Sequence, residues 1–502
     1  MSTRLSKGGR LINRSKPVEF SFDGKRLNGY EGDTLASALL ANNQTLVGRS
    51  FKYHRPRGIV ASGPEEPNAL VGLGKGDKFE PNQRATTTEL FDGLHSNSQN
   101  AWPSLEFDIG GVNRIMSRVF PAGFYYKTFI FPRFAWKHIF EPIIRKAAGL
   151  GAAPTEKDAD KYEYFYAHVD VLIIGGGTSG LAAALEVGRS GAKVLVLEQK
   201  NTWGGRAPVD GVFIDNQISE EWIDDAITEL QSMPNVTLKN RTMGAGVYDH
   251  GWATGYESIT DHMPGKKGPR QRLWRIRAKR ILTTTGAIER PLSFAGNDLP
   301  GVMLAGSVRD YLVDFGTSCG DIMVLATNND DAYRTAIKQS EVGLKVAAIL
   351  DARTSVTGEL PNKAREMGIR VETGMAISKV KGSKSVSGVS ICLQAGEGVP
   401  LEEIKCDVVA MSGGWSPIVH LWSHCGGKLN WDAENAMFRP DPERPPLGDD
   451  GSGFVAVGGT ANGYMIDNEA MQDAISQGKL VAKQVGYKPV NSKSSIVNVE
   501  NE

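Results

Sequence analysis

The chain has 502 residues, with 57 lysines and arginines against 57 aspartates and glutamates, so its formal net charge is zero. Hydrophobic residues make up 40% and charged residues 23%, which is ordinary for a globular protein of several domains. The neutral balance argues against a nucleic-acid binder that works through bulk charge. No apolar run reaches the roughly 18 residues of a membrane span.

The cysteines are isolated. They are Cys319, Cys392, Cys406 and Cys425, and no CxxC pair occurs. This pattern predicts a reduced, cytoplasmic protein without a metal site or a redox disulfide. The polar N-terminus has no apolar core of a signal peptide, so none is expected.

Residues 1–95 predict a small β-grasp domain of the ferredoxin type. In "VEFSFDGKRLNGY" apolar residues alternate around a turn at Asp23-Gly24, which indicates a hairpin. "EGDTLASALLANN" follows as a helix with Asp33 or Thr34 as its N-cap.

Residues 96–168 form an aromatic-rich segment that contains "VFPAGFYYKTFIFPRFAWKHIF". Basic residues interrupt its apolar pattern. We expect these aromatic side chains to bury against a neighbouring domain or a partner subunit. A helix lying on a membrane surface is the alternative.

The remaining chain predicts an α/β architecture. The fold class is a two-dinucleotide-binding-domain, flavoprotein-like Rossmann fold, preceded by the β-grasp domain without cluster cysteines. The expected order is a dinucleotide-binding domain at 169–300, a second nucleotide-binding-like domain at 301–430, a return to the first at 431–490, and a tail at 491–502.

The string "VDVLIIGGGTSGLAAALE" carries the dinucleotide fingerprint G-x-G-x-x-G between a predicted strand and helix. Gly175 allows the tight turn, Gly177 lets the backbone approach a pyrophosphate, and Gly180 lets helix and strand pack closely. Glu198 ends the next strand, where it can accept hydrogen bonds from ribose hydroxyls. A carboxylate there favours NAD or FAD over NADP.

Three later stretches complete the predicted site. They are "TWGGR", "LTTTGAIERP" and "FVAVGGTANG". Flavoproteins of this type usually carry Gly-Asp in the last loop, whereas this chain has Gly458-Gly459, which favours NAD over FAD. The full predicted cofactor-binding set is Gly175, Gly177, Thr178, Ser179, Gly180, Glu198, Gln199, Lys200, Gly205, Arg206, Met243, Gly286, Gly459, Tyr464 and Met465.

The second strand–helix–strand unit has "ATNNDDAY" where a glycine turn would be needed, which predicts a retained fold without a second pyrophosphate site. Asp351, at the end of its second strand, is expected to be a solvated loop residue. Cys319 is expected in the core. His54, within "FKYHRPRG", belongs either to a surface basic loop or to a cluster that faces a flavin phosphate or a partner.

The chain resembles the α subunit of heterotetrameric sarcosine oxidase over residues 5–490. The resemblance rests on "FDGKRLNGYEGDTLASALLANN", "LVGRSFKYHRPRGIVASGPEEPNALV", "PAGFYYKTFIFP", "IIGGGTSGLAAALE", "TTGAIERPLSFAGNDLPGVMLAGS" and "VAVGGTANG". It implies an oxidoreductase subunit for CH–NH donors that is inactive alone. It also implies NAD on this chain, FAD on a partner β subunit, FMN at the interface with that partner, and small γ and δ subunits.

The same resemblance implies oxidative demethylation of sarcosine to glycine, with oxygen reduced to hydrogen peroxide on partner flavins. Catalytic residues on this chain are therefore unassigned. The family's α subunit continues into a folate-binding aminomethyltransferase domain. For this protein three alternatives stay open: the folate-binding domain is on a separate chain, the sequence is a fragment, or folate is not used.

Relatives that oxidise opines, hydroxyproline or N-methylglutamate share this scaffold, and some carry a [2Fe–2S] cluster in the β-grasp domain. Three of the cluster positions fall on Ala61, Glu66 and Ala69, so the loop cannot ligate iron through thiolates. This departure favours the sarcosine branch. The alternatives are a subunit of such a related dehydrogenase, a free-standing FAD-dependent NAD(P)H reductase, and a non-enzymatic assembly platform with structural NAD.

Overall fold

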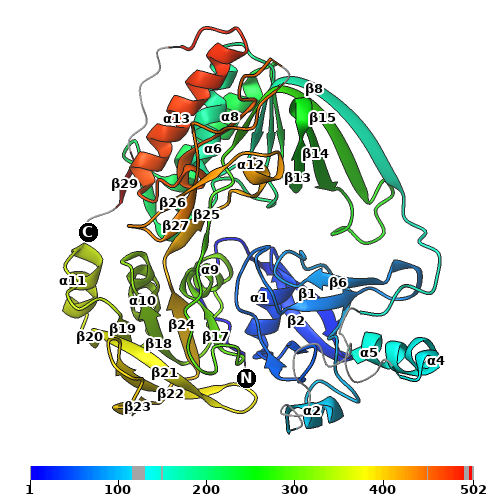
Figure 1. The fold of residues 1–502 in the computed structure, drawn as a ribbon, viewed down its shortest axis with the longest axis vertical. Helices are drawn as coiled ribbons and strands as arrows, with labels where there is room; N and C mark the ends of the chain where they lie inside the picture. Colours follow the sequence, from blue (N-terminus) through cyan, green and yellow to red (C-terminus); the bar gives the residue numbers. More distant parts are fainter. Residues whose placement is uncertain (1, 116–130, 148–150, 449, 491–496, 500–502) are drawn as a thin grey trace. The chain divides into compact units, whose positions relative to one another are not determined.

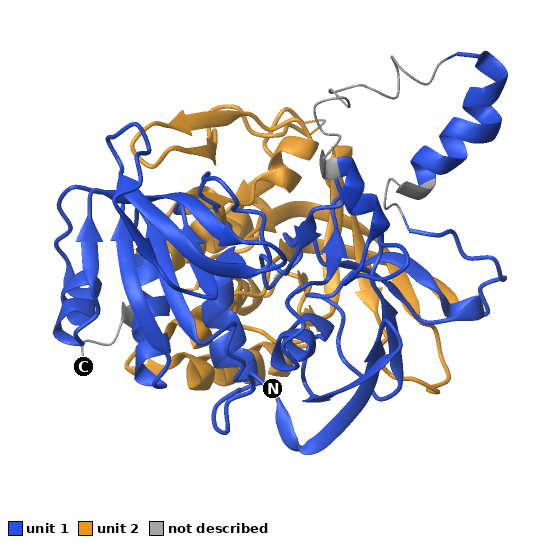
Figure 2. Cartoon of the chain, turned by 90° about the horizontal axis from the view of Figure 1, so that it is seen from below, with its two compact units in different colours: residues 1–159, 290–414 blue, residues 160–289, 415–502 orange. Residues whose placement is uncertain are grey.

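The chain forms two compact units, each built from two stretches of sequence (Figures 1 and 2). Unit 1 comprises Met1–Ala159 and Arg290–Gly414, and unit 2 comprises Asp160–Glu289 and Trp415–Glu502. The structure is a computed structural model that describes residues 2–115, 131–147, 151–448, 450–490 and 497–499. Most of "PAGFYYKTFIFP" and much of the predicted tail lie outside these residues.

Unit 1 begins with the predicted hairpin. Asp23 and Gly24 have φ angles of +49° and +77°, the combination that a two-residue type I′ turn requires. The turn sets the register so that Phe20 and Phe22 both point into the core, where they are 2% and 1% exposed. The sheet order is β2-β1-β7-β5-β6. Its strands and the helix packed on it are β1 (Asn13–Phe22), β2 (Lys25–Glu31), α1 (Leu35–Ala41), β5 (Leu70–Leu73), β6 (Glu80–Arg84) and β7 (Leu94–Asn97).

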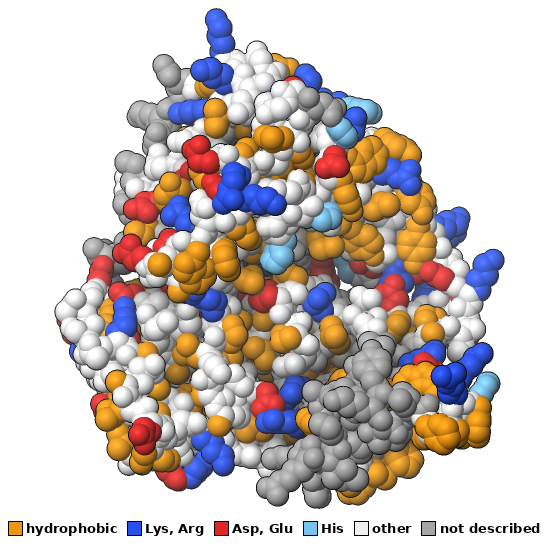
Figure 3. All heavy atoms as spheres, in the orientation of Figure 1, with side chains coloured by type: hydrophobic (Ala, Val, Ile, Leu, Met, Phe, Trp, Pro, Cys, Tyr) orange, Lys and Arg blue, Asp and Glu red, His pale blue; other side chains and the backbone are white. Residues whose placement is uncertain are grey.

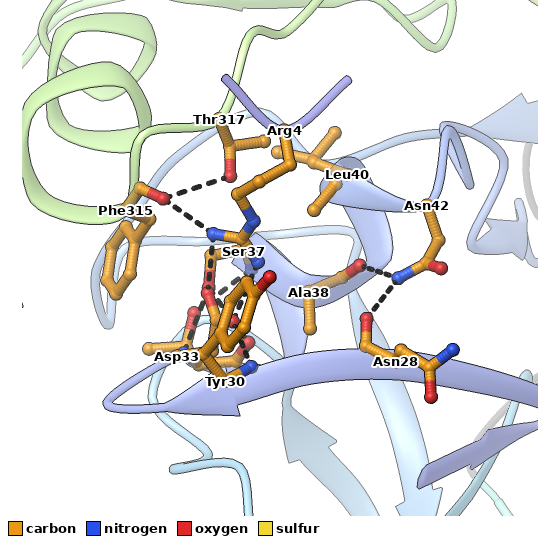
Figure 4. A network of polar contacts seen from close by, with 12 residues as sticks. Arg4, Asn28, Tyr30, Asp33, Ser37, Ala38, Leu40, Asn42, Phe315 and Thr317 are labelled. Atoms are coloured by element: carbon orange, nitrogen blue, oxygen red, sulfur yellow. Dashed lines mark hydrogen bonds and ion pairs between the residues drawn. The ribbon is translucent and has the colours of Figure 1, made fainter. Parts of the chain in front are cut away.

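Thr34 is the N-cap of α1. Its hydroxyl accepts a hydrogen bond from the Ser37 N–H, and the Ser37 hydroxyl accepts one from the Thr34 N–H, which forms a reciprocal capping box. Asp33, the other residue expected as a cap, instead pairs with Arg4. The Arg4 guanidinium donates to both carboxylate oxygens, at 3.0 and 2.7 Å, and to the Phe315 carbonyl at 2.5 Å (Figure 4).

The second part of unit 1 is a parallel α/β layer. Its sheet order is β17-β24-β18-β19-β20. Tyr311 and Tyr333 from this layer share one core cluster with Phe20 and Leu39 of the β-grasp domain. The elements are β17 (Val302–Leu304), α9 (Ala305–Phe315), β18 (Ile322–Thr327), α10 (Asp331–Glu341), β19 (Lys345–Asp351), α11 (Glu359–Glu366), β20 (Val371–Thr373) and β24 (Val408–Ser412). A small antiparallel sheet adds β21 (Met375–Gly382), β22 (Val386–Leu393) and β23 (Glu402–Ile404).

Unit 2 contains the dinucleotide-type fold. Its sheet runs β12-β9-β8-β15-β14-β13, and β28 pairs with β15. The predicted strand Val171–Ile174 is confirmed as the end of β8, and the predicted helix begins at Thr178. The elements are β8 (Tyr162–Ile174), α6 (Thr178–Arg189), β9 (Val194–Leu197), α8 (Ser219–Ser232), β12 (Val236–Lys239), β13 (Thr242–Tyr248), β14 (Trp252–Ser258), β15 (Gln271–Thr283), β28 (Val455–Val457) and α13 (Asp467–Gln484). Helix α6 packs against both α13 and α8 (Figure 1).

Several short elements complete the two units. In unit 1 they include β3 (Gly48–Arg49), β4 (Pro56–Arg57), α2 (Val112–Ile115), α4 (Arg133–Ala135) and α5 (Glu141–Ala147). In unit 2 they include α7 (Ala207–Asp210), β10 (Val212–Ile214), β11 (Gln217–Ile218), β16 (Ala287–Glu289), β25 (Trp415–Pro417), α12 (His420–His424), β26 (Leu429–Asp432), β27 (Met437–Pro440) and β29 (Val497–Val499). Strand β29 lies within the predicted tail and pairs with β10. No helix in the described part of the chain has both the length and the apolar character to cross a membrane.

Replacing Arg4 by alanine tests the ion pair with Asp33. The two side chains are 8% and 0% exposed, so R4A leaves a buried carboxylate without its cation. Removing one partner of a buried pair costs about 3 kcal/mol or more. We expect R4A to lower the free energy of unfolding by that order in urea titrations. The matched control, Lys16→Ala, removes an exposed pair with Glu31 and should change stability much less. Equal effects of the two substitutions would contradict this assignment.

Candidate functional site: a dinucleotide turn in unit 2

The turn between β8 and α6 is packed as tightly as glycine allows. Gly175 has a φ of +112°, and a Cβ on it would lie 2.2 Å from the Thr284 carbonyl oxygen. A Cβ on Gly180 would lie 1.9 Å from the Gly175 carbonyl oxygen. Both positions exclude any side chain, so these two glycines are required for the fold itself.

Gly177 is different because its surroundings are open. Within 4 Å of a Cβ there, the described residues offer a single atom, the Gly205 Cα at 3.9 Å. Gly286 is similarly open, with the Thr460 hydroxyl at 3.9 Å. Gly177 also immediately precedes α6, whose first N–H groups carry the partial positive charge of a helix N-terminus. The turn therefore presents bare backbone and helix N–H groups to a space that an anion could fill.

Glu198 lies beside this turn and is 7% exposed. One carboxylate oxygen accepts the Gly176 N–H at 2.7 Å, and the other accepts the Lys200 N–H at 2.8 Å. Burial raises the pKa of Glu198, while these backbone donors and the Lys200 charge oppose the rise. A carboxylate has about four acceptor positions, so the two hydrogen bonds leave capacity for hydroxyl donors.

The segment after Glu198 folds back onto the turn. Gly204 donates its N–H to the Gly176 carbonyl at 2.8 Å, which brings Gly205 against Gly177. The next residue, Arg206, lies over the Trp415 ring with its Cζ 5.1 Å from the ring centroid, and it pairs with Asp210 at 3.3 Å.

The late glycine loop closes on the start of α6. A Cβ on Gly459 would lie 2.6 Å from the Ser179 hydroxyl, so the side chain of Ser179 occupies the place that an aspartate at 459 would need. A carboxylate is nevertheless present beneath this loop. Asp473 of α13 accepts the Gly459 N–H at 2.9 Å and the side-chain amide of Asn462 at 3.2 Å. Burial raises the pKa of Asp473, and these donors oppose the rise.

The other predicted site residues lie at varied positions around this turn. Met243 follows Thr242, whose N–H donates to the Glu198 carbonyl at 2.7 Å, and its side chain is 44% exposed. Thr178 begins α6. Tyr464 lies under the guanidinium of Arg439 at 5.1 Å. The exposed residues at the end of β9 are Gln199 and Lys200, and Met465 is half-buried after the late loop.

Three residues that the sequence did not single out hold the site together. The Thr284 hydroxyl donates to the Gly175 carbonyl at 2.9 Å and so fixes the turn from the end of β15. Asp473 supports the late loop, and Trp415 supports Arg206. Thr284 lies within the motif "LTTTGAIERP", which points to its neighbourhood, whereas no local pattern marks Asp473 or Trp415.

The corresponding turn of unit 1, between β18 and α10, is filled by the chain's own side chains. Asp351 was expected to be a solvated loop residue, and this expectation is wrong, because Asp351 is fully buried. It accepts hydrogen bonds from the Tyr333 hydroxyl at 2.8 Å and from the Arg353 guanidinium at 2.7 and 3.0 Å. Arg353 also donates to Asp330, just before α10. The N-cap residue of α10 is thus a paired carboxylate, at the helix terminus that a phosphate would use.

The basic loop of unit 1 is likewise paired internally. His54 is only 9% exposed, and its Nδ1 lies 2.6 Å from a carboxylate oxygen of Asp108. Arg55 and Arg57 both pair with Asp298. The prediction of a core thiol is confirmed for Cys319, where burial raises the pKa to about 12. Among the residues that the structure describes, no cluster of histidine, cysteine and acidic side chains could hold a metal ion.

Comparison with known families agrees with this division of the chain. Residues 15–101 match a 2Fe-2S iron-sulfur cluster binding domain, and residues 170–252 match the FAD dependent oxidoreductase family. The N-terminal sheet is therefore ferredoxin-like, and unit 2 has a flavoprotein-type nucleotide-binding fold.

Among curated proteins, the chain is 47% identical over 439 residues to the sarcosine oxidase α subunit of Rhizobium meliloti (strain 1021), covering 87% of this chain and 44% of that protein. It is 35% identical to the sarcosine oxidase α subunit of Corynebacterium sp. (strain P-1), over 86% of this chain and 40% of that protein. An opine oxidase subunit of Rhizobium meliloti is 26% identical over 54% of this chain and 55% of that protein. The chain thus spans less than half the length of the two sarcosine oxidase subunits.

Among solved structures, the L-proline dehydrogenase from P. horikoshii superposes with a TM-score of 0.64 at 20% identity, over 98% of this chain and 76% of that chain. This likeness shows a shared fold. The sequence matches, and not this likeness, relate the chain to the sarcosine oxidase α subunits.

Substituting single glycines of the turn separates folding from ligand access. G180A places a methyl group 1.9 Å from a backbone oxygen, so the backbone must move. Overpacking of this kind costs about 1–3 kcal/mol, and we expect that loss in urea unfolding followed by tryptophan fluorescence. G177A, with 3.9 Å to its nearest neighbour, should leave the unfolding midpoint almost unchanged. If both variants were equally destabilised, the assignment of Gly177 to an open space would fail.

Proposed function

We propose that unit 2 binds one dinucleotide, NAD, and that the chain is the NAD-binding subunit of an amine-oxidising complex of the sarcosine oxidase type. The observation that carries this proposal is the open position at Gly177, next to the buried carboxylate of Glu198. Both features are typical of a dinucleotide site. Closing the turn does not require open space at Gly177, and Glu198 keeps acceptor capacity beyond its hydrogen bonds to Gly176 and Lys200.

The residues present fit such a ligand. The N–H groups at the start of α6, with Thr178 and Ser179, would hold the pyrophosphate, and Gly205 would allow close approach from the other side. Glu198 would accept the ribose hydroxyls and repel a 2′-phosphate, which favours NAD over NADP. Flavoproteins of this type usually carry an aspartate at the position of Gly459, and the Ser179 side chain leaves no room for one here. This difference favours NAD over FAD. When bound, NAD supplies a ring that can take or give a hydride. The family resemblance implies that NAD transfers no hydride during turnover.

The proposed overall reaction converts sarcosine, oxygen and water into glycine, formaldehyde and hydrogen peroxide. The amine would lose its electrons to FAD on a partner β subunit, and FMN between the two subunits would pass them to oxygen. Small γ and δ subunits would complete the complex. This chain, inactive alone, would provide NAD and one wall of the interface. The similarity to the opine oxidase subunit makes a related secondary amine the alternative substrate.

Exposed aromatic side chains support the need for a partner. Strand β8 starts within the segment that was predicted to form an interface, and its Tyr162, Tyr164 and Tyr166 are 44%, 63% and 62% exposed. Hydrophobic side chains gather on the surface over β8 and β15 (Figure 3). Arg275 lies 5.3 and 5.4 Å from the centroids of the Tyr164 and Tyr166 rings. Tyrosine and arginine are enriched where proteins associate, so this face of unit 2 suits contact with another protein chain.

A free-standing NAD(P)H reductase fits less well. Such an enzyme needs two nucleotide sites, one for the flavin and one for NAD(P)H. At the second turn of this chain, Arg353 pairs with both Asp330 and Asp351. The proposal therefore assigns the chain one nucleotide and places the flavins on or beside a partner.

A tryptophan at Gly177 tests the cofactor site. Its side chain would fill the space opposite Gly205 and block phosphate contacts to the helix N-terminus. Purified G177W should therefore hold at least about 10-fold less dinucleotide than the wild type. The cofactor is released by heat and identified by mass spectrometry, and we expect NAD.

The control is Gly111→Trp in unit 1, where a Cβ would have no neighbour within 4 Å among the residues that the structure describes. The cofactor content of this variant should be unchanged. Recovery of FAD in place of NAD would contradict the NAD assignment and favour the reductase. An unchanged dinucleotide content in folded G177W would show that the site lies elsewhere.

A further inference from the structure

The N-terminal domain matches a family described by its 2Fe-2S cluster, yet its residues do not fit such a cluster. Clusters of this kind are held by cysteine thiolates. The matched residues 15–101 contain no cysteine, because the four cysteines of the chain begin at Cys319. Another group must therefore organise the loop that in cluster-binding members closes around iron and sulfide.

The structure places one carboxylate at the centre of this loop. Glu66 is 2% exposed. Its Oε2 accepts the N–H groups of Val60 and Ala61 at 2.8 and 2.7 Å, and its Oε1 accepts those of Asn68 and Ala69 at 2.7 and 3.0 Å. Four backbone donors from both arms of the loop thus converge on one anion, which fills the acceptor positions of a carboxylate.

The arrangement offsets the cost of burying a charge. Burial raises the pKa of Glu66, and the four N–H donors oppose that rise. Hydrogen bonds to an ionised acceptor are roughly twice as strong as neutral ones. Without the carboxylate, the four loop N–H groups would be buried and would lack acceptors. A buried N–H group without an acceptor lowers the stability of the fold more than one that is exposed to water.

The loop so formed contacts the parallel layer of unit 1. The Tyr311 hydroxyl donates to the Ala61 carbonyl at 2.9 Å, and the Ser62 hydroxyl donates to Asp310 at 2.6 Å. The Leu304 N–H donates to the Val60 carbonyl at 2.9 Å. The residues that supply the first pair of Glu66 donors, with the serine that follows them, therefore anchor the β-grasp domain to β17 and α9.

We propose that the Glu66 carboxylate takes the place of the iron–sulfur cluster as the internal anion of this domain. An iron–sulfur cluster accepts hydrogen bonds at its sulfurs from surrounding donors, and here a side chain of the protein accepts them. The domain needs no iron to fold its loop and carries no electrons. It is a fixed joint between the β-grasp sheet and the parallel layer of unit 1. This inference does not depend on the identity of the dinucleotide in unit 2.

Glu66→Gln in the full chain tests the proposal. Glutamine keeps the shape but offers one acceptor oxygen and one NH₂ group, which would face two N–H donors. We expect the amides of residues 60, 61, 68 and 69 to exchange hydrogen at least about 10-fold faster, as loss of buried acceptors predicts, in mass-spectrometric exchange of peptides that span the loop. The matched control is Glu65→Gln at the neighbouring, half-buried position, which should leave exchange in the loop unchanged. Unaltered exchange in E66Q, or equal acceleration in both variants, would overturn the proposal.

A second measurement uses the wild-type chain and stays decisive if E66Q does not fold. The purified protein is incubated anaerobically with ferrous iron and sulfide, desalted, and assayed for iron, labile sulfide and the visible absorbance of a cluster. We expect no bound cluster. Stoichiometric iron and sulfide in the wild type would overturn the proposal, because the loop would then accommodate the cluster beside Glu66.

Discussion

The contact between Gly180 and the carbonyl of Gly175 is the constraint on which unit 2 depends. Because residue 180 lacks a side chain, α6 can start shortly after the strand turn and still lie against β8. The Thr284 hydroxyl reinforces this closeness, since it donates to the same Gly175 carbonyl from the end of β15. The tight closure leaves Gly177 at the open end of the turn, where helix N–H groups and the Glu198 carboxylate come together. The open position of the candidate site is thus a consequence of how strand and helix pack.

Unit 1 is held together by polar contacts that converge on α9 and the residues around it. At the end of α9, Arg4 bridges Asp33 of the β-grasp domain to the Phe315 carbonyl. Along the helix, the loop centred on Glu66 reaches Tyr311 and Asp310. A continuous apolar core lies beneath both contacts. The Glu66 carboxylate, which accepts four backbone N–H groups, fixes the loop that joins the β-grasp sheet to α9.

The sequence predicted those elements whose conformation is determined by residues close together in the chain. The hairpin at Asp23-Gly24, the capped helix α1 and the glycine turn all depend on neighbouring residues, and the structure contains each of them. Partners distant in sequence were missed because no local pattern specifies them. Asp473 reaches Gly459 from a helix, and Asp351 is buried by Tyr333 and Arg353, whose side chains arrive from α10 and the next loop. The sequence showed only that Glu66 stands at a position where a cluster would need a cysteine. Its role in holding the loop follows from the four backbone N–H groups that donate to it in the structure.

The two glycine-type turns of the chain can be compared energetically. In unit 2, a Cβ on Gly177 or Gly286 would have its nearest described neighbour at 3.9 Å, so the backbone at these two positions is open to a ligand. In unit 1, a dinucleotide ribose would have to displace Arg353 from the fully buried Asp351. The Arg353 side chain is 34% exposed, so solvent screens this pair, but separating it would leave the carboxylate of Asp351 buried without that cation. A second nucleotide is therefore disfavoured at α10 by the protein's own charges.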